Sequence, residues 1–453
     1  MTTSAPTTDT RSLPRRVYDL AWPVIGENFM ETLLGIVDTL IVAQLGIIAI
    51  AGVGTAVQVM FFVLSALSAV AVGSAVLVAQ AYGGRDLVRA SQLARQSMIW
   101  SVIISIPLAG LGLLLAEPII GLFGLEPEVT QIGVDYLMVT MGASVVMTGN
   151  FIAGGILRGA DDSRTPMLVK VVANVINVFL TYSLVFGSFG FPELGPVGSA
   201  WGTFFARGIG LSLILLVLWR GRNGVSIGGG GSWWPDVAIA KQVLTIGIPA
   251  ALEQVINSVA FFVLTMVVAS LGTDTFAAHR IALSAMSLSF MPGLGFGMAA
   301  TSLIGQSIGA KRPDEAAEAG WIATYWSVLW MGALGILFYF FAPLIMGFFT
   351  DEQHVIDIGV SGLQVIALAQ PFWAILLVQS SALRGTGDTN YPLRVNAVSM
   401  WIGVGISFLW ISRLGGDLGT VWICFMTTAP FAAFFMAQRF RTTLTKLSPV
   451  PLY

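Results

Sequence analysis

The hexapeptide WPVIGE at residues 22–27 returns as IPAALE at residues 248–253, 226 residues further along the chain. In each copy a glutamate, Glu27 or Glu253, follows a proline by four residues. The same offset joins other identical residues: Gly46 and Gly272, Gln80 and Gln306, Gly83 and Gly309, Gly121 and Gly347, Gly133 and Gly359, Arg158 and Arg384, Asp162 and Asp388, and Pro166 and Pro392. One constant offset indicates two homologous halves.

The composition is that of a membrane protein. Of the 453 residues, 56% are hydrophobic and 10% are charged, and the mean hydropathy is +0.83. Soluble domains carry about 25% charged residues. The net charge of −2 and the lack of a basic run give no sign of a nucleic-acid partner. A single cysteine, Cys424, excludes an internal disulfide and a cysteine metal cluster.

Twelve segments are apolar over the roughly 20 residues that a helix needs to cross a bilayer. They cover residues 17–42, 52–80, 93–116, 130–157, 167–187, 197–219, 242–270, 276–305, 319–345, 356–383, 391–412 and 417–438. Six spans in each half is an even number, so both halves begin on the same side of the membrane. The predicted fold is an all-α integral membrane protein with two homologous six-helix bundles, related by a pseudo-two-fold axis along the membrane normal. Such an architecture is typical of transporters.

Basic residues predict the orientation. Of the 22 lysines and arginines, Arg207 and Arg280 lie inside predicted helices, Arg413 lies in a loop on one side, and the other 19 lie on the opposite side. Positive loops face the cytoplasm. We therefore expect a multi-pass protein of the plasma (inner) membrane with both termini cytoplasmic. The polar N-terminus lacks the pattern of a signal peptide, so the first apolar helix is expected to be retained.

The predicted domains follow from these spans. They are a cytoplasmic tail at 1–16, an N-terminal lobe at 17–220, a cytoplasmic linker at 221–241, a C-terminal lobe at 242–438 and a cytoplasmic tail at 439–453. The linker contains four glycines at 228–231 and the pair Trp233-Trp234. Glycine predicts flexibility, and tryptophan suits the membrane interface.

Carboxylates inside a bilayer are costly, so each one calls for a reason. The first helix holds Glu27, Glu31 and Asp38, whose spacing places them on one helical face. Glu253 repeats Glu27 in the second half. A buried carboxyl can bind and release a proton, or bind sodium or a cationic substrate. The alternative is a structural role, through pairing with Arg207 or hydrogen bonds between helices.

Neutral oxygens could complete an ion site. Asn174, Asn177 and Thr181 share one face of the fifth predicted helix, and Thr203 lies in the sixth. With Asp38, the residues Asn177, Thr181 and Thr203 are candidates for a sodium site. Hydrogen bonding between helices is an equally good interpretation of these side chains.

Polar residues within the spans would make a substrate cavity partly polar. The candidates are Glu27, Gln58, Asn150, Glu253, Gln254, Asn257 and Gln379. Pro23 and Pro249 each free a backbone carbonyl in a spanning helix and are candidate hinges.

Two matching loops are interpreted as structural. Arg158 and Asp162, and Arg384 and Asp388, indicate helix ends with turn chemistry and cytoplasmic anchoring charges.

The chain has no Walker loop, zinc motif or nucleophile elbow, so we expect neither an enzyme nor a pump driven by ATP.

With these residues in place, the chain resembles the multidrug and toxic compound extrusion (MATE) family over nearly its whole length. The motifs that carry the resemblance are VDT at 37–39, QAYGG at 80–84 with its repeat QSIGA at 306–310, LRGA at 157–160 followed by Asp162, LRGTGD at 383–388, the Asn174 and Asn177 pattern, and AAH at 277–279.

The resemblance implies a twelve-helix exporter whose two lobes surround a central cavity. It implies expulsion of organic, mainly cationic and amphipathic drugs or toxins by alternating access, in antiport with H⁺ or Na⁺ and without a cofactor. Asp38 matches the family's acidic residue in helix 1, and Asn177, Thr181 and Thr203 fall where its companions are expected. One chain contains both lobes, so we expect a functional monomer.

The chain also departs from the family pattern. Thr181 stands where proton-coupled members often have an aspartate, and the tenth span reads QPFW at 370–373 without a central acid. The choice between H⁺ and Na⁺ therefore stays open, and Glu27 and Glu253 are hypothesised to have taken over some of the coupling.

Other classes fit less well. The alternative within the superfamily is a flippase for lipids or lipid-linked oligosaccharides, which would hold pyrophosphate with basic side chains, and only Arg207 and Arg280 are candidates. A membrane-embedded enzyme with paired carboxylates would need a further catalytic constellation. A channel would need a pore loop or filter motif.

Overall fold

The computed structural model describes residues 11–447, which form helices joined by short loops. The parts of the two predicted tails at 1–10 and 448–453 lie outside the described residues. The helices are α1 (Leu13–Ala43), α2 (Ile47–Gly83), α3 (Leu87–Gly121), α4 (Pro127–Gly142), α5 (Ser144–Gly159), α6 (Arg164–Phe186), η1 (Ser188–Gly190), α7 (Val197–Arg220), α8 (Val237–Ala269), α9 (Thr273–Gly309), α10 (Pro313–Phe340), α11 (Ala342–Gly347), α12 (Gln353–Thr386), α13 (Asn390–Leu414), α14 (Leu418–Met426) and α15 (Ala429–Leu447).

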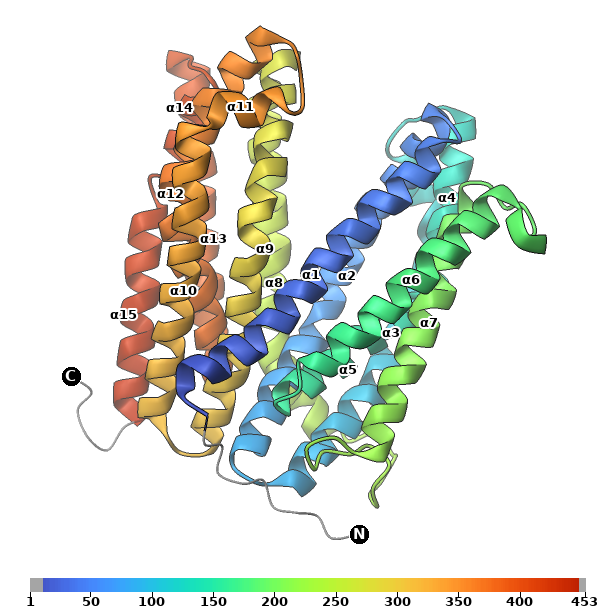
Figure 1. Ribbon diagram of the computed structural model, residues 1–453, viewed down its shortest axis with the longest axis vertical. Helices are drawn as coiled ribbons and strands as arrows, with labels where there is room; N and C mark the ends of the chain where they lie inside the picture. Colours follow the sequence, from blue (N-terminus) through green and yellow to red (C-terminus); the bar gives the residue numbers. More distant parts are fainter. Residues whose placement is uncertain (1–10, 448–453) are drawn as a thin grey trace. The chain divides into compact units, whose positions relative to one another are not determined.

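A helix or a pair of helices matches every predicted span (Figure 1). Between residues 11 and 447, ten helices are long and apolar enough to cross a membrane when α14 and α15 are counted as one, and the bent pair α4 and α5 can form an eleventh span. The 31 residues of α1 also have the length of a span, although its four carboxylates make it less apolar. The predicted all-α membrane fold is confirmed.

Three predicted spans are broken rather than continuous, and in one of them, 319–345, the break between α10 and α11 at Phe341 lies close to the end. The span at 130–157 consists of α4 and α5, which bend by 48° at Ala143. The span at 417–438 consists of α14 and α15, which are separated at residues 427–428. Gly142 and Ser144 flank the break at Ala143, and glycine–serine pairs are a common cause of kinks. Apolar composition does not reveal such a break, because the residues on both sides remain apolar.

The helices form two compact units. Unit 1 contains residues 26–251, and unit 2 contains residues 11–25 with residues 252–447. The boundaries lie inside α1 and α8, close to Pro23 and Pro249, and not in the linker. The units differ from the predicted lobes at 17–220 and 242–438, because the first half of each of these two helices packs with the helices of the other repeat.

Close backbone contacts explain why the first half of α1 and the first half of α8 each pack with helices of the other repeat. A Cβ atom on Gly247 of α8 would lie 1.8 Å from the carbonyl oxygen of Ala69 in α2, so only glycine allows the two helices to approach this far. In unit 2 the corresponding contact joins α1 and α9, where a Cβ on Gly295 would lie 2.4 Å from Cγ1 of Ile25. The buried Val17 and Leu20 of α1 belong to a core cluster of unit 2.

Side-chain contacts also hold the N-terminal ends of α1 and α8. Arg16 of α1 forms an ion pair with Glu315 of α10 within unit 2. In unit 1, Nη2 of Arg89 donates a hydrogen bond of 2.9 Å to Oε1 of Gln242 in α8. Gln242 and Arg89 are the repeat counterparts of Arg16 and Glu315, because the offset of 226 residues joins both pairs.

The linker is fastened to unit 1, contrary to the flexibility that its glycines predict. Arg95 of α3 donates hydrogen bonds to the carbonyl oxygens of Ile227, at 3.0 Å, and Gly229, at 2.6 Å, and its guanidinium stacks on Trp233. Gln96 bonds with the backbone of Trp234 and Asp236. A Cβ on Gly231 would lie 1.9 Å from Nη1 of Arg95, so this glycine allows close packing.

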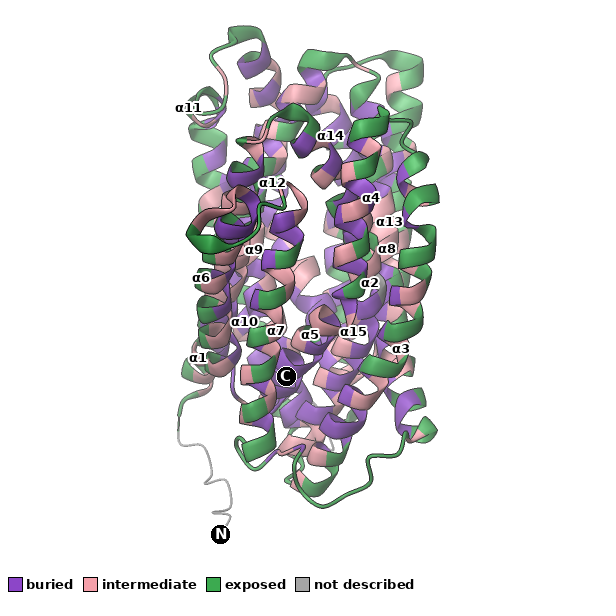
Figure 2. Ribbon diagram, turned by 90° about the vertical axis from the view of Figure 1, so that its right-hand side faces the viewer, coloured by how far each residue is buried: buried purple, intermediate pink, exposed green. Residues whose placement is uncertain are grey.

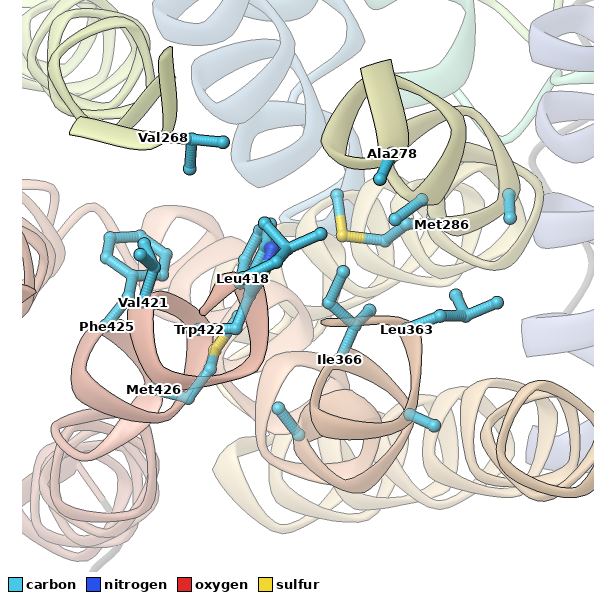
Figure 3. Close-up of a cluster of buried hydrophobic side chains, with 14 of the residues drawn as sticks. Val268, Ala278, Met286, Leu363, Ile366, Leu418, Val421, Trp422, Phe425 and Met426 are labelled. Carbon is cyan, nitrogen blue, oxygen red and sulfur yellow. The ribbon is translucent and has the colours of Figure 1, made fainter. Parts of the chain in front are cut away.

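Each unit has its own apolar core. Figure 3 shows part of the core of unit 2, a cluster that contains Trp422 of α14, Leu363 and Ile366 of α12 and Met286 of α9. In unit 1 a separate cluster joins α2, α3, α5 and α7 with the first half of α8. Large apolar side chains also remain exposed, for example those of Leu114, Phe340 and Phe431. Such surfaces suit contact with lipid. Exposed residues of every kind are green in the ribbon of Figure 2.

Candidate functional site

A cavity of about 80 Å³ lies inside unit 1 among α1, α5, α6 and α7. Its polar lining consists of Glu27, Glu31, Asn150, Arg158, Lys170 and Arg207. Its apolar lining includes Leu64, Met147 and Phe151. Of the predicted cavity residues, the structure therefore places Glu27 and Asn150 here, with Glu31 beside them.

The charged residues of the cavity form one continuous chain of ion pairs. Arg158 Nη1 lies 3.1 Å from Oε2 of Glu27, and Lys170 Nζ lies 3.5 Å from its Oε1. The same Lys170 nitrogen lies 2.8 Å from Oε2 of Glu31, whose other oxygen accepts a hydrogen bond from Arg207. Glu31 is thus held between two cations, and the structural alternative of pairing with Arg207 is realised.

The positions of Arg158 and Lys170 correct the sequence interpretation. Arg158 was expected to be a cytoplasmic anchoring charge and Lys170 was only counted among the 19 basic residues of the cytoplasmic side, but Arg158 is 8% exposed and both line the cavity. They lie in the last turn of α5 and the second turn of α6, and their long side chains reach Glu27 from there. The sequence carried a signal for the first pair, because Arg158 follows Glu27 by 131 residues and Arg384 follows Glu253 by the same number.

Unit 2 contains the repeat counterpart of this cluster. Glu253 is 2% exposed, and its Oε1 lies 2.9 Å from Arg384 Nη2. The same oxygen accepts a hydrogen bond of 2.6 Å from Nδ2 of Asn396, the residue that corresponds to Lys170. Asn396 also donates to Ser380 at 3.1 Å. The unit 2 cluster is therefore simpler and contains one acid and one base, since Glu31 and Arg207 have the uncharged counterparts Asn257 and Ala433.

Asp38 lies further along α1 and is not part of the cavity lining. Among the described residues, its buried Oδ1 atom has no hydrogen-bond partner. Nearby, Asn177 donates to Oγ1 of Thr203 at 3.0 Å, and Thr181 donates to Oδ1 of Asn177 at 3.2 Å. The structure thus brings together three of the four candidate sodium ligands and leaves a carboxylate oxygen of the fourth unsatisfied.

The remaining predicted residues lie apart from the cavity. Asn174 donates to the carbonyl oxygen of Met30 at 3.0 Å and so ties α6 to α1. Gln379 is fully buried in unit 2 and donates to Thr324 at 2.9 Å. Gln58 and Gln254 are exposed, and Asn257 is half-buried with a buried Oδ1 atom that has no partner among the described residues.

The two matching loop aspartates have the structural role that their sequence indicates. Asp162 accepts hydrogen bonds from the backbone and hydroxyl of Thr165, and Arg222 lies 2.7 Å away. Asp388 accepts from the backbone of Tyr391 and pairs with Arg439 at 2.7 Å. In each unit the aspartate joins the start of one helix to a basic residue near the end of the repeat.

Comparison with known proteins identifies the family of this chain. A sequence model of the MatE family matches residues 23–183 and 249–411, which together are more than half of the 453 residues. The chain belongs to the MatE family. The two matched segments begin at Pro23 and Pro249, so the repeat unit of MatE proteins coincides with the internal repeat of this chain.

MatE relatives match along the whole chain. A "Probable multidrug resistance protein NorM" of Thermotoga maritima is 29% identical over 458 residues, covering 97% of this chain and 96% of that protein. Crystal structures described as MATE in the straight and in the bent conformation match with TM-scores of 0.90 and 0.89. Their identities are 23% and 22%, and they cover 99% and 96% of this chain and 99% and 96% of theirs. These structures support the fold of the MatE chain.

Proposed function

We propose that this protein exports amphipathic organic compounds by alternating access, in antiport with H⁺ or Na⁺. Membership of the MatE family and the likeness to a protein named for multidrug resistance support efflux. The observation that carries the coupling is the buried Oδ1 atom of Asp38, which has no hydrogen-bond partner among the described residues. A buried polar atom without a partner is costly, so a bound proton or cation would stabilise it.

The surroundings of Asp38 suit either ion. Thr181, Thr203 and Asn177 supply neutral oxygens, which are ligands that hard cations accept. Equally, one added proton would let the carboxyl donate a hydrogen bond. Ion binding here removes or offsets a charge inside unit 1. Antiport further requires that ion and substrate favour different conformations.

The ion pairs of Glu27 and Glu253 favour an anchoring role for both carboxylates. Each carboxylate already pairs with an arginine, which leaves it less free to hold a coupling ion. Both glutamates follow the prolines at which α1 and α8 pass from one unit into the other. We infer that Pro23 and Pro249 act as hinges and that the two glutamates fix each helix beyond its hinge. Solved relatives in straight and bent conformations are consistent with a hinge.

Location and assembly complete the proposal. The distribution of basic residues supports an inner-membrane protein with cytoplasmic termini. Both units come from one chain, which supports a functional monomer.

Efflux of a fluorescent dye from proteoliposomes tests the coupling. A proton gradient and a sodium gradient are imposed separately on wild-type protein and on Asp38→Asn. We expect transport with one of the two gradients and its loss in Asp38→Asn. Transport that ignores both gradients, or phospholipid scrambling in place of dye efflux, would contradict the proposal.

A further inference from the structure

The charged side chains that line the unit 1 cavity sum to a positive charge, which is the wrong sign for a site that binds cations. Arg158, Lys170 and Arg207 supply three positive charges, whereas Glu27 and Glu31 supply two negative ones. Asp38 lies outside the lining, and when ionised it brings the total only to zero. In neither state does the cavity have the excess negative charge that would attract a further cation.

We propose that this cavity binds the carboxylate end of an amphipathic anion, with Lys170 as the residue that sets the charge preference. The inference rests on the proposed export function and narrows its substrate class, which the family resemblance alone would make mainly cationic.

The contacts of Glu31 show that Lys170 and Arg207 together can bind a carboxylate. Its carboxylate bridges Lys170, at 2.8 Å, and Arg207. The Glu31 side chain is 45% exposed, whereas those of Lys170 and Arg207 are each 15% exposed. A carboxylate that enters from the accessible side of Glu31 therefore meets two mostly buried cations. A guanidinium has five N–H donors, and among the described residues Arg207 engages Nη2 with Glu31.

The size of the cavity limits what enters it. A volume of about 80 Å³ is well below the roughly 300 Å³ or more that sites for whole drug-sized ligands occupy. A carboxylate group fits, while the apolar body of the ligand stays outside the cavity. Met147, Phe151 and Leu64 in the lining would contact the apolar atoms next to the carboxylate.

The second unit supplies an internal comparison for Lys170. Its counterpart there is Asn396, which bonds to Glu253 without adding a charge. Lys170→Asn therefore places in unit 1 the residue that the repeat already uses in unit 2. The substitution removes one of three positive charges and leaves a side chain that can still donate to Glu27.

The test is equilibrium binding of two probes with the same fluorophore to purified protein in neutral phosphatidylcholine nanodiscs. Dansylglycine carries a carboxylate, and dansylcadaverine carries an ammonium group. We expect the wild type to bind dansylglycine more tightly, and Lys170→Asn to lower the ratio of the two affinities about tenfold, since a unit charge at contact distance in a partly buried site is worth at least that much.

Matched variants separate the charge effect from misfolding. Lys170→Arg keeps the charge and should keep the wild-type ratio. Lys311→Asn makes the same chemical change in a cytoplasmic turn whose positive φ of 58° suits asparagine, and should also leave the ratio unchanged. If Lys170→Asn does not fold, as judged by its melting temperature, Arg207→Gln provides the same test on the second cation.

The outcomes are distinct. A wild type that prefers dansylcadaverine, or equal ratios for Lys170→Asn and Lys311→Asn, overturns the inference. Because binding is measured at equilibrium, the preference does not depend on a gradient. The expected preference without gradient-driven efflux of either probe would contradict the proposed function and leave the anion site standing. Coupled efflux by a protein that prefers dansylcadaverine would support the proposed function and overturn the anion site.

Discussion

Arg384 Nη2 lies 2.9 Å from Oε1 of Glu253, and this ion pair repeats the one between Arg158 and Glu27, whose nitrogen and oxygen are 3.1 Å apart. In both pairs the arginine comes from the end of a helix near the middle of its repeat, and the glutamate lies just beyond the proline of α1 or α8. Two copies of one contact, at the two places where a helix changes units, indicate that the contact holds those helices in register.

Glu253→Gln should therefore destabilise the protein more than Glu27→Gln. Glu253 is 2% exposed, and its loss leaves Arg384 without a counter-charge, whereas after the loss of Glu27 the cavity around Arg158 still contains Glu31. Removing one partner of a buried pair costs about 3 kcal/mol, and less here because Arg384 is 25% exposed. Thermal unfolding in detergent measures the difference, with the exposed Glu117→Gln as control. Equal melting temperatures for Glu253→Gln and Glu117→Gln would show that the pair does not stabilise unit 2.

Gly247→Ala should disrupt the contact between α8 and α2. The added Cβ would lie 1.8 Å from the carbonyl oxygen of Ala69, so the helices must move apart, at a cost of about 1–3 kcal/mol. Gly54→Ala in α2 is the matched control, because a Cβ there has no atom within 4 Å and alanine favours a helix by up to about 1 kcal/mol. Folded yield and melting temperature should fall for the first variant only. A normal Gly247→Ala protein would mean that the first half of α8 is not tightly held in unit 1.

Arg95→Ala should release the linker from α3. The substitution removes two hydrogen bonds to the carbonyls of Ile227 and Gly229 and the stacking on Trp233. Proteinase K should then cut between residues 221 and 236 at a concentration that leaves the wild type intact. Arg441→Ala serves as control, since its guanidinium also stacks on a tryptophan, Trp321, but away from the linker. Similar digestion of all three proteins would show that Arg95 does not hold the linker, and would support the flexibility that the glycines predict.

Pro23→Ala and Pro249→Ala should each slow efflux several-fold and leave equilibrium binding of the substrate unchanged. Alanine restores a backbone hydrogen bond to the residue four positions earlier and stiffens the helix where it passes between units. Pro107→Ala in the interior of α3 is the comparison, because this proline is not at a unit boundary. Efflux rates and binding constants are measured on the same preparations. The hinge interpretation fails if Pro107→Ala slows efflux as much as the other two.

Much of the architecture could be predicted because it depends on composition and repetition. Apolar length located the spans, and the offset of 226 residues located both halves. The kink at Ala143 could not be predicted, because glycine and serine occur throughout these helices without bending them. The docked linker was missed for a related reason: its glycines predict freedom, whereas Gly231 is needed for the close approach of Arg95.

The site was predicted unevenly. Spacing placed Asn177 and Thr181 on one helical face, whereas their link to Asp38 and Thr203 on other helices came from side-chain type and from the family resemblance. Lys170 was missed because it was counted only among the basic residues of the cytoplasmic side, and the reach of a lysine side chain is not visible in a hydropathy pattern. The repeat could have drawn attention to it, since Lys170 and Asn396 occupy corresponding positions and only one of them is charged.

The exchange of helix halves between the units bears on how such a chain could arise. The segment at 13–25 is buried among helices of the second repeat, and the segment at 237–251 is buried among helices of the first. A half-length ancestor would have left this part of its first helix uncovered, and a second identical copy is the partner that could bury it. Fusion of two gene copies would then have joined an obligate, segment-swapped dimer and not two self-sufficient proteins.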